Sequence, residues 1–239
     1  MNICIDIGNT SAKLGVFEHD NLLTVLPDLT DKKLIGIIKS EKPDHVMISS
    51  VRKGIGKIIA RCKAQTHTLV LDHKTPLPIS IDYGTPQTLG VDRICAAVGA
   101  HFLFPHTNNL VVDIGTCITY DLIDHTSVYR GGAISPGMDM KLKAMHKFTS
   151  KLPVVAFSGI AGPIGKSTRE CMLGGAVNGT QAEIEGMIKQ FGQFYEKLTI
   201  IFCGGGAIFF ESKIKEHIFA IPNLVLVGLN QILIFNLHD

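Results

Sequence analysis

Two short segments of the chain place a carboxylate, a glycine and small polar side chains in the same order. The first reads Asp6-Ile-Gly-Asn-Thr, and the second, much later, reads Asp113-Ile-Gly-Thr. Each follows an apolar run that is typical of a buried strand. Glycine after a strand permits a sharp turn, and successive backbone N–H groups in such a turn can form a concave anion site. The carboxylate can hold a hydrated metal ion beside it.

This combination predicts a site for phosphate groups. Hydroxyl and amide side chains after each glycine can add hydrogen bonds to phosphate oxygens. The predicted contacts are Asp6, Gly8, Asn9, Thr10 and Lys13 in the first copy, and Gly115, Thr116 and Thr119 in the second. A single turn of this kind could be an ordinary glycine hairpin. Two copies in equivalent surroundings favour a functional role.

Two other glycine-containing segments invite a ligand-binding interpretation. The segment "GPIGKSTRE" (162–170) resembles a P-loop, but Ile160 stands where that motif needs its first glycine, so we reject this interpretation. The segment "CGGGA" (203–207) follows an apolar strand. Its glycines would let a flat ligand such as adenine approach the backbone, or would allow a tight helix-packing turn. The sequence leaves these two alternatives open.

A strand must precede each turn in the sequence, and the apolar periodicity predicts these strands. In the first part of the chain the pattern alternates hairpin, helix, strand, helix and strand. The predicted strands cover residues 1–7, 12–17, 44–51 and 67–72, with a third hairpin strand starting near residue 21, and the predicted helices cover 30–40 and 53–65. Residues 73–90 are rich in Pro, Gly and Thr and are predicted to form a connecting loop.

The second part of the chain repeats this order. We predict a helix over 92–104, a strand-turn-strand over 110–122, a Gly-Pro loop leading into a helix over 129–145, a helix over 167–194 and a strand-turn over 199–207. The segment 223–235 is predicted as a strand, a glycine break and a short helix. The repeated order predicts an internal duplication of an α/β unit, with domains at residues 1–90 and 91–239.

The composition excludes several classes of protein. With 46% hydrophobic and 18% charged residues the chain is globular, and a net charge of +2 is too small to imply nucleic-acid binding. Asp6 interrupts the first apolar run, so we expect no signal peptide, and we expect no membrane span. The six cysteines lack metal or redox spacing. We therefore expect a cytoplasmic location.

Six motifs carry a resemblance to a known family. They are "IDIGNTSAKLGVF", "ISSV", "DYGTPQTLGVDR", "VVDIGTCITYDL", "GGAISPGMDM" and "GKSTRECMLGGAVNG". In this order they resemble type III pantothenate kinase, within the superfamily of sugar kinases, actin and heat-shock chaperone ATPases. The resemblance implies a duplicated actin-like ATPase (ribonuclease H-like) α/β fold, with two similar domains of mixed sheets and an interdomain cleft.

The resemblance also implies an activity. It implies ATP-dependent phosphorylation of pantothenate, the first step of coenzyme A biosynthesis, by a homodimer that uses Mg²⁺ and a monovalent cation, K⁺ or NH₄⁺. Neither nucleic acid nor a membrane is an expected partner. The β and γ phosphates of ATP are expected between the two Asp-Ile-Gly turns.

The resemblance assigns roles to individual residues. Asp92 corresponds to the general base, Asp113 to a ligand of the monovalent cation, and Asp6 reaches Mg²⁺ through water. The implied substrate contacts are Tyr83, Gly90, Val91, Asp92, Arg93 and Thr168. In the late glycine turn Cys203 stands where the family usually has threonine, so a hydroxyl donor is missing there.

Structural alternatives remain for several of these residues. Asp92 could cap a helix, Arg93 could form a structural ion pair, and Lys13 could be a solvated strand lysine. Two rival functions also remain: a non-catalytic accessory factor in transcriptional regulation, and a kinase of the same superfamily with another small hydroxyl or carboxylate substrate. The presence of Asp6, Asp92, Arg93 and Asp113 favours the enzyme, and the motif from Gly90 to Arg93 favours pantothenate.

Overall fold

The computed structural model describes residues 1–8, 11–159 and 161–237, and it separates into two compact units. Unit 1 consists of Met1–His106, Ile123–Gly131 and Asn223–Asp239; unit 2 consists of Thr107–Leu122 and Gly132–Pro222. The compact units therefore divide the chain at other points than residues 90 and 91, and the predicted domain boundary stays a prediction. Within the described ranges, no helix combines the length and apolar character that crossing a membrane requires.

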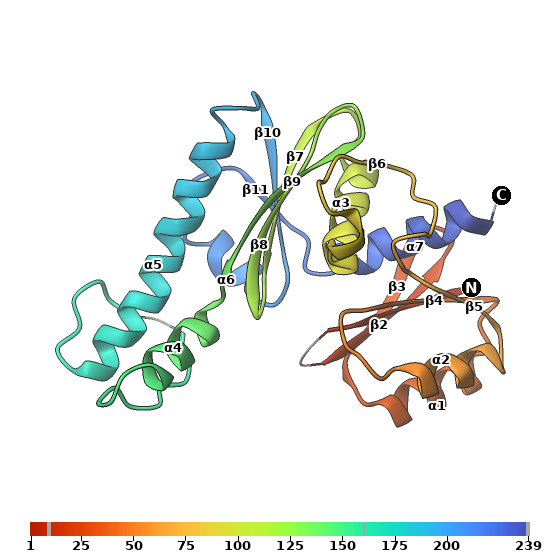
Figure 1. Ribbon diagram of the computed structural model, residues 1–239, viewed down its shortest axis with the longest axis horizontal. Helices are drawn as coiled ribbons and strands as arrows, with labels where there is room; N and C mark the ends of the chain where they lie inside the picture. Colours follow the sequence, from red (N-terminus) through yellow and green to blue (C-terminus); the bar gives the residue numbers. More distant parts are fainter. Residues whose placement is uncertain (9–10, 160, 238–239) are drawn as a thin grey trace. The chain divides into compact units, whose positions relative to one another are not determined.

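Unit 1 is built on a mixed five-stranded sheet (Figure 1). Its strands are β1 (Asn2–Ile7), β2 (Ala12–Glu18), β3 (Asn21–Leu29), β4 (His45–Ser50) and β5 (His67–Val70), in the order β3-β2-β1-β4-β5. The hairpin partners β1–β2 and β2–β3 are antiparallel, whereas β1–β4 and β4–β5 are parallel. The parallel pairs are joined by helices, as crossover connections require.

Alternate residues of β1 point to opposite faces of this sheet, and both kinds are mostly buried. Helices therefore cover both faces. Ile3, Ile5 and Ile7 pack with α1 (Asp31–Glu41) and α2 (Gly56–Lys63). On the other face Cys4 reaches Asn230 of α7 (Leu224–Leu237), which packs along α3 (Val91–Leu103). Figure 1 shows these two helix pairs on opposite sides of the sheet. The predicted capping of α1 is confirmed, since the Thr30 hydroxyl accepts a hydrogen bond from the Lys33 N–H.

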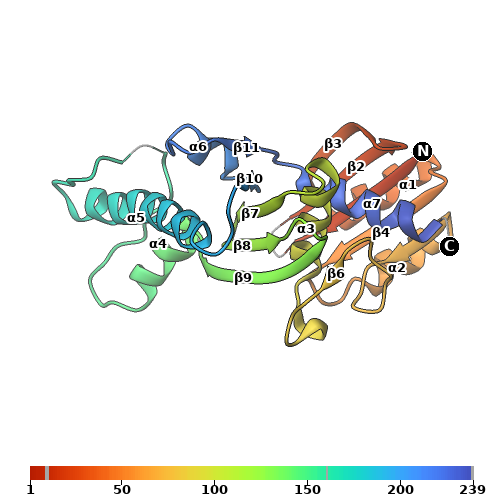
Figure 2. The ribbon, with the colours of Figure 1, turned by 90° about the horizontal axis from the view of Figure 1, so that it is seen from above.

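The second sheet has six strands. They are β6 (Ser80–Ile81), β7 (Asn108–Ile114), β8 (Cys117–Ile123), β9 (Val128–Pro136), β10 (Leu198–Cys203) and β11 (Ile218–Ala220), in the order β11-β10-β7-β8-β9-β6. Figure 2 shows the long strands β7, β8 and β9 side by side. A short 3₁₀ helix, η1 (Pro86–Thr88), follows β6 and precedes α3. The predicted loop 73–90 therefore contains both a short strand and a helical turn.

The helices of unit 2 are α4 (Met138–Lys147), α5 (Thr168–Phe191) and α6 (Ala207–Glu211). Ile184 and Ile188 of α5 join Phe210 of α6 in the core that covers one face of β7, β8 and β10. The first half of α5 continues past the sheet and packs with α4 around Leu142 and Met172 (Figure 1). The described residues of unit 2 therefore form at least these two hydrophobic clusters.

The predicted duplication is confirmed by the strand orders. The first sheet runs β3-β2-β1-β4-β5, and the second, read from its other end, runs β9-β8-β7-β10-β11 with β6 added at the edge. In both copies a helix precedes the parallel partner of the first strand. The two Asp-Ile-Gly turns follow β1 and β7, which are the equivalent central strands.

Residues 129–136, predicted as part of a Gly-Pro loop, belong to strand β9 instead. Gly132 explains the difference, because a Cβ atom at this position would overlap the backbone carbonyl of Tyr120 in β8. Glycine is required here by the close approach of a neighbouring strand. The local pattern of glycines suggested a loop, because it contains no information about that neighbour.

The last segment is one continuous helix, α7, and not a strand, a glycine break and a short helix. Its Gly228 lies where α7 crosses α3, and a Cβ atom there would overlap the backbone carbonyl of Cys95. Gly99 of α3 lies on the opposite side of this contact. The glycine therefore permits close helix packing, which outweighs its poor helix propensity of about 1 kcal/mol.

Candidate active site

Asp6 lies near the end of β1 between two polar residues of neighbouring strands. Antiparallel pairing places it opposite Lys13 of β2, and parallel pairing places it opposite Ser49 of β4. The Ser49 hydroxyl donates a hydrogen bond of 2.7 Å to Oδ1 of Asp6. The carboxylate thus has a fixed orientation before any ligand binds. The Lys13 ammonium donates to Oδ1 of Asn223 at 3.4 Å, so Lys13 is not simply a solvated strand lysine.

The turn after β1 begins at Gly8, whose N–H donates a hydrogen bond of 3.0 Å to the carbonyl of Ser11. A Cβ atom at Gly8 would lie 3.3 Å from that same carbonyl oxygen, so a larger residue would crowd the turn. The predicted contacts Asn9 and Thr10 lie outside the described residues. Their roles stay predictions.

Burial raises the pKa of Asp6, and the negative charge of Asp92 raises it further, whereas the Ser49 hydrogen bond and the Lys13 charge act in the opposite direction. The charges of Asp6 and Asp92 also raise the pKa of the buried Cys95 thiol, after burial itself. The structure therefore brings Asp6 and Asp92 into one electrostatic environment, although they are far apart in the sequence. A cation bound there would relieve the repulsion between the two carboxylates.

A stability measurement tests this electrostatic description. Because the folded state raises the pKa of Asp6 above its ordinary value of 3.8, the ionised carboxylate opposes folding once the pH exceeds that raised pKa. Asp6→Asn should therefore raise the Tm of the ligand-free protein at pH 7.5, by about 2–4 °C for each kcal/mol of relieved repulsion. The gain should shrink as the pH falls through the raised pKa of Asp6 and should be absent at about pH 3.5, below the ordinary value of 3.8. Differential scanning calorimetry at both pH values measures it.

The exposed residue Asp20 supplies the control for this measurement. Its side chain accepts a hydrogen bond from Gln231, which an asparagine oxygen can also accept. Asp20→Asn should leave Tm nearly unchanged at both pH values. An Asp6→Asn variant that is less stable than wild type at pH 7.5 would show that the carboxylate is not under electrostatic strain.

Asp92 lies in the first turn of α3, two residues after the cap residue Gly90. Its Oδ1 accepts a hydrogen bond of 2.9 Å from the backbone N–H of Arg93. A Cβ atom at Gly90 would lie only 2.5 Å from that oxygen, so glycine at this position leaves room for the carboxylate. Gly90, and not Asp92, occupies the cap position that the structural alternative assigned to Asp92. Arg93 is buried and the neighbouring Val91 is half-buried.

Tyr83 follows β6 and is half-buried. Its ring packs edge-to-face against the buried ring of Tyr129, with centroids 6.1 Å apart. The same ring lies over Gly131, where a Cβ atom would lie 3.5 Å from it and where φ is +91°. The Tyr83 side chain is thus held against β9 by its contacts with Tyr129 and Gly131.

In unit 2 the second Asp-Ile-Gly turn connects β7 and β8, and the N–H of Gly115 donates to the carbonyl of Cys117 at 2.9 Å. Parallel pairing with β10 places Asp113 opposite Cys203. A Cβ atom at Gly204, where φ is +78°, would overlap the Asp113 carboxylate. The "CGGGA" segment therefore approaches Asp113 with its backbone, so it serves at least as a packing turn. Its use as an adenine shelf stays a prediction.

Thr116 is exposed, and its carbonyl accepts a hydrogen bond of 3.1 Å from the N–H of Gly137. Thr119 lies within β8, and its hydroxyl donates to Asp121 at 2.7 Å. Thr168 is the first residue of α5 and is exposed. The preceding Ser167 caps this helix through the N–H of Glu170, so Thr168 is free of that structural task. The roles of all three threonines stay predictions.

Three contacts of these site residues were not predicted from the sequence. Ser49 orients Asp6, Asn223 contacts Lys13, and Gly204 approaches Asp113. The signal for Ser49 was a pair of serines in an otherwise apolar strand, within the motif "ISSV". No local signal identified Asn223, because its position depends on the return of the chain to unit 1 after residue 222.

Comparisons with solved structures identify the fold. A Baf family transcriptional activator from Campylobacter jejuni has a TM-score of 0.66 at 21% identity, covering 99% of this chain and 100% of that one. An activator of 2-hydroxyisocaproyl-CoA dehydratase from Clostridium difficile, with bound ADPNP, has a TM-score of 0.56 at 12% identity, covering 100% and 97%. The chain therefore has the predicted two-domain α/β fold of the actin-like ATPases and sugar kinases.

Sequence comparison identifies the family. The family model of type III pantothenate kinases matches residues 2–190. A type III pantothenate kinase from Cytophaga hutchinsonii is 44% identical over 236 residues, which cover 99% of this chain and all of that protein. The chain belongs to the type III pantothenate kinase family.

Proposed function

We propose that this protein transfers the γ-phosphoryl group of ATP to the primary hydroxyl of pantothenate, giving 4′-phosphopantothenate, the first step of coenzyme A biosynthesis. The observation that carries the proposal is 44% identity over 99% of the chain to a type III pantothenate kinase. Membership in a kinase family implies the use of ATP. The pair of carboxylates at Asp6 and Asp92 supports the same conclusion, because it supplies separate groups for a metal ion and for a proton.

Asp6 is the proposed contact to Mg²⁺. Mg²⁺ is usually held by one or two carboxylates together with water and substrate phosphates. In the described part of the chain no three His, Cys, Asp or Glu residues form a ready metal cage, which agrees with that mode of binding. The bound ion would neutralise phosphate charge. Ser49 contributes by fixing the carboxylate, and Gly8, Asn9, Thr10 and Lys13 are the proposed phosphate contacts of the same turn.

Asp92 is the proposed general base. Phosphoryl transfer depends mainly on positioning and on charge stabilisation, so the carboxylate orients the attacking hydroxyl and accepts its proton. The Arg93 N–H holds one oxygen of this carboxylate in place. Gly90, Val91, Arg93, Tyr83 and Thr168 are the proposed contacts to pantothenate.

Asp113 is the proposed ligand of a monovalent cation, K⁺ or NH₄⁺, with Gly115, Thr116 and Thr119 as ATP contacts. The half-buried carboxylate supports this assignment, since such cations bind through oxygen atoms. Strand register makes Ser49, beside Asp6 in the first copy, equivalent to Cys203, beside Asp113 in the second. The two copies thus differ in the residue paired with the aspartate, which agrees with the binding of different cations.

We also propose a cytoplasmic homodimer. Unit 2 exposes large apolar side chains that a monomer would leave in water. They are Phe148 (79% exposed), Val154 (70%), Ile164 (83%) and Phe194 (80%). Exposed apolar surface is typical of protein interfaces where such side chains gather. Light scattering during gel filtration measures the mass in solution, and a monomer at micromolar concentration would contradict the proposal.

A coupled assay with a series of cations tests the proposed function. Purified protein with ATP and Mg²⁺ should convert pantothenate to its phosphate in the presence of K⁺ or NH₄⁺, and should be much slower with Na⁺ alone. Formation of 4′-phosphopantothenate should be followed directly by mass spectrometry. Absence of turnover in every cation would contradict the enzyme and would favour the non-catalytic alternative.

A further inference from the structure

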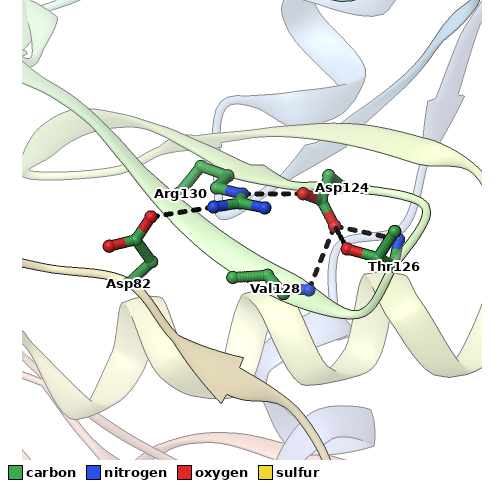
Figure 3. A network of polar contacts seen from close by, with 5 residues as sticks. All are labelled: Asp82, Asp124, Thr126, Val128 and Arg130. Carbon is green, nitrogen blue, oxygen red and sulfur yellow. Dashed lines mark hydrogen bonds and ion pairs between the residues drawn. The ribbon is translucent and has the colours of Figure 1, made fainter.

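The side chains of Asp82, Arg130 and Asp124 form a chain of ion pairs (Figure 3). The guanidinium of Arg130 in β9 donates from Nη1 to Asp82 at 2.8 Å and from Nε to Asp124 at 2.7 Å. All three residues belong to unit 1. None of them is among the residues assigned to ATP, metal or substrate, so this network needs its own explanation.

The Asp124 end of the network is rigid. Asp124 is buried, and its Oδ1 accepts hydrogen bonds from the N–H and hydroxyl of Thr126 and from the N–H of Val128. Burial alone would raise the pKa of Asp124, but these hydrogen bonds and the one from Arg130 outweigh it and lower the pKa to about 2. Asp124 therefore stays ionised at every pH where enzymes of this kind work, and it holds Arg130 in one orientation.

The Asp82 end of the network is exposed and adjoins Tyr83. The Asp82 side chain is 67% exposed, and the backbone N–H of Asp82 donates to the Tyr129 carbonyl at 3.0 Å. Strand β6 contains only Ser80 and Ile81, so few backbone hydrogen bonds attach this segment to β9. Arg130 adds a side-chain attachment at the point where the chain leaves the strand.

The ion pair between Asp82 and Arg130 lies directly beside the contacts that hold Tyr83 against β9. Tyr83 comes immediately after Asp82, and its ring lies over Gly131, which comes immediately after Arg130. The ion pair and the packing of Tyr83 therefore join the segment that follows β6 to β9 at neighbouring residues. An exposed ion pair contributes little to global stability, so its most direct effect is on the local placement of the tyrosine.

We propose that Arg130 is a positioning residue which, held by Asp124, anchors Asp82 and so keeps Tyr83 in place to bind pantothenate. The proposal rests on the proposed function, which assigns Tyr83 to the substrate. Arg130 itself does not touch the reacting atoms. Its loss should loosen pantothenate binding while leaving ATP binding and overall stability close to wild type.

The test compares Arg130→Gln, Asp82→Asn and Arg130→Lys with the control Arg61→Gln, which removes an exposed arginine of α2. We expect the first two variants to raise the KM for pantothenate about fivefold, a change in binding of the size that one weak interaction supplies. The kcat and the KM for ATP should stay within about twofold. Arg130→Lys should give an intermediate KM, because an ammonium keeps the positive charge but lacks the two separate nitrogens, Nε and Nη1, with which the guanidinium contacts the two carboxylates. Arg61→Gln should match wild type.

Two combined variants test the route of the effect. If Arg130 acts through Asp82 and Tyr83, Arg130→Gln should raise the pantothenate KM no further in an Asp82→Asn or a Tyr83→Ala background. A further fivefold rise in the Tyr83→Ala background would overturn the proposal. Thermal unfolding checks that each variant is folded, and if Arg130→Gln is not, the exposed Asp82→Asn decides alone.

The outcomes separate this proposal from the proposed function. An active wild type with an unchanged pantothenate KM in Asp82→Asn and Arg130→Gln overturns the positioning role only. An inactive wild type overturns the proposed function, and the positioning role with it. A rise in the KM for ATP equal to that for pantothenate also counts against the proposal, because it indicates a general structural effect.

Discussion

Asp92→Asn is expected to lower the kcat of pantothenate phosphorylation by at least about a hundredfold, the usual scale for loss of a general base and equivalent to about 2.7 kcal/mol of activation free energy. Asparagine keeps the shape of the side chain, and its oxygen can still accept the hydrogen bond from the Arg93 N–H. It cannot accept the proton of the substrate hydroxyl. The KM for ATP should change little. Steady-state kinetics with both substrates varied measure these effects.

The helix α4 offers a matched control for this variant. Asp139 lies two residues after the cap residue Gly137, as Asp92 lies two residues after Gly90, and both are acidic residues in a first helical turn. Asp139→Asn loses the same favourable interaction with the helix N-terminus, worth about 0.3–1 kcal/mol, but should keep full activity. Full activity in Asp92→Asn would show that Asp92 is not the base, and would leave the proposed function intact.

Gly90→Ala should lower kcat by about tenfold to a hundredfold without unfolding the protein. The added methyl group would lie 2.5 Å from Oδ1 of Asp92, so the carboxylate must rotate away from its contact with Arg93. Misplacement of a reacting group by about 1 Å can cost on the order of a hundredfold in rate. Folding should tolerate the change, because Gly90 has φ of −58°, which alanine adopts easily, and because the atom it displaces ends a side chain.

Gly36→Ala serves as the control for adding a methyl group. Gly36 lies within α1, and no atom would lie within 4 Å of its new Cβ. This variant should keep wild-type kcat and gain stability of about 0.5–1 kcal/mol, because alanine favours the helix. In the Asp92→Asn background, Gly90→Ala should reduce kcat little further, since the group it displaces no longer acts. A multiplicative loss in that double variant would indicate that Gly90→Ala damages the site by another route.

Strands, helices and the duplication could be predicted from the sequence because their signals are local. Apolar runs typical of buried strands indicated β1, β4 and β7, and the Thr-Asp start indicated α1. Failures occurred where a glycine is needed by a partner from another part of the chain. Gly132 and Gly228 were interpreted as signs of a loop and of a break, but they permit close contact with β8 and with α3. A local pattern cannot distinguish a glycine that bends the chain from one that makes room.

The candidate site also contains features that could be predicted from the sequence and contacts that could not. The two acidic turns were predicted from residue types and spacing, because glycine turns leave local marks. The motif from Gly90 to Arg93 and the role of Tyr83 were predicted from the family resemblance. The partner of Asp6 was not evident, because Ser49 reaches it only through the parallel pairing of β1 with β4. The same holds for the attachment of Asp82 to Arg130, which depends on the pairing of β6 with β9.

The sequence by itself determined the class of fold, the family resemblance and the acidic residues proposed for catalysis, since each depends on neighbouring residues in the chain. Only the tertiary structure decided which side chains surround those acids. It joined Asp6 electrostatically to Asp92, placed Gly204 against Asp113 and linked Asp124 to Asp82 through Arg130. The physical reason is that orientation, burial and charge interactions come from strand register and helix packing between distant segments, which no short stretch of sequence contains.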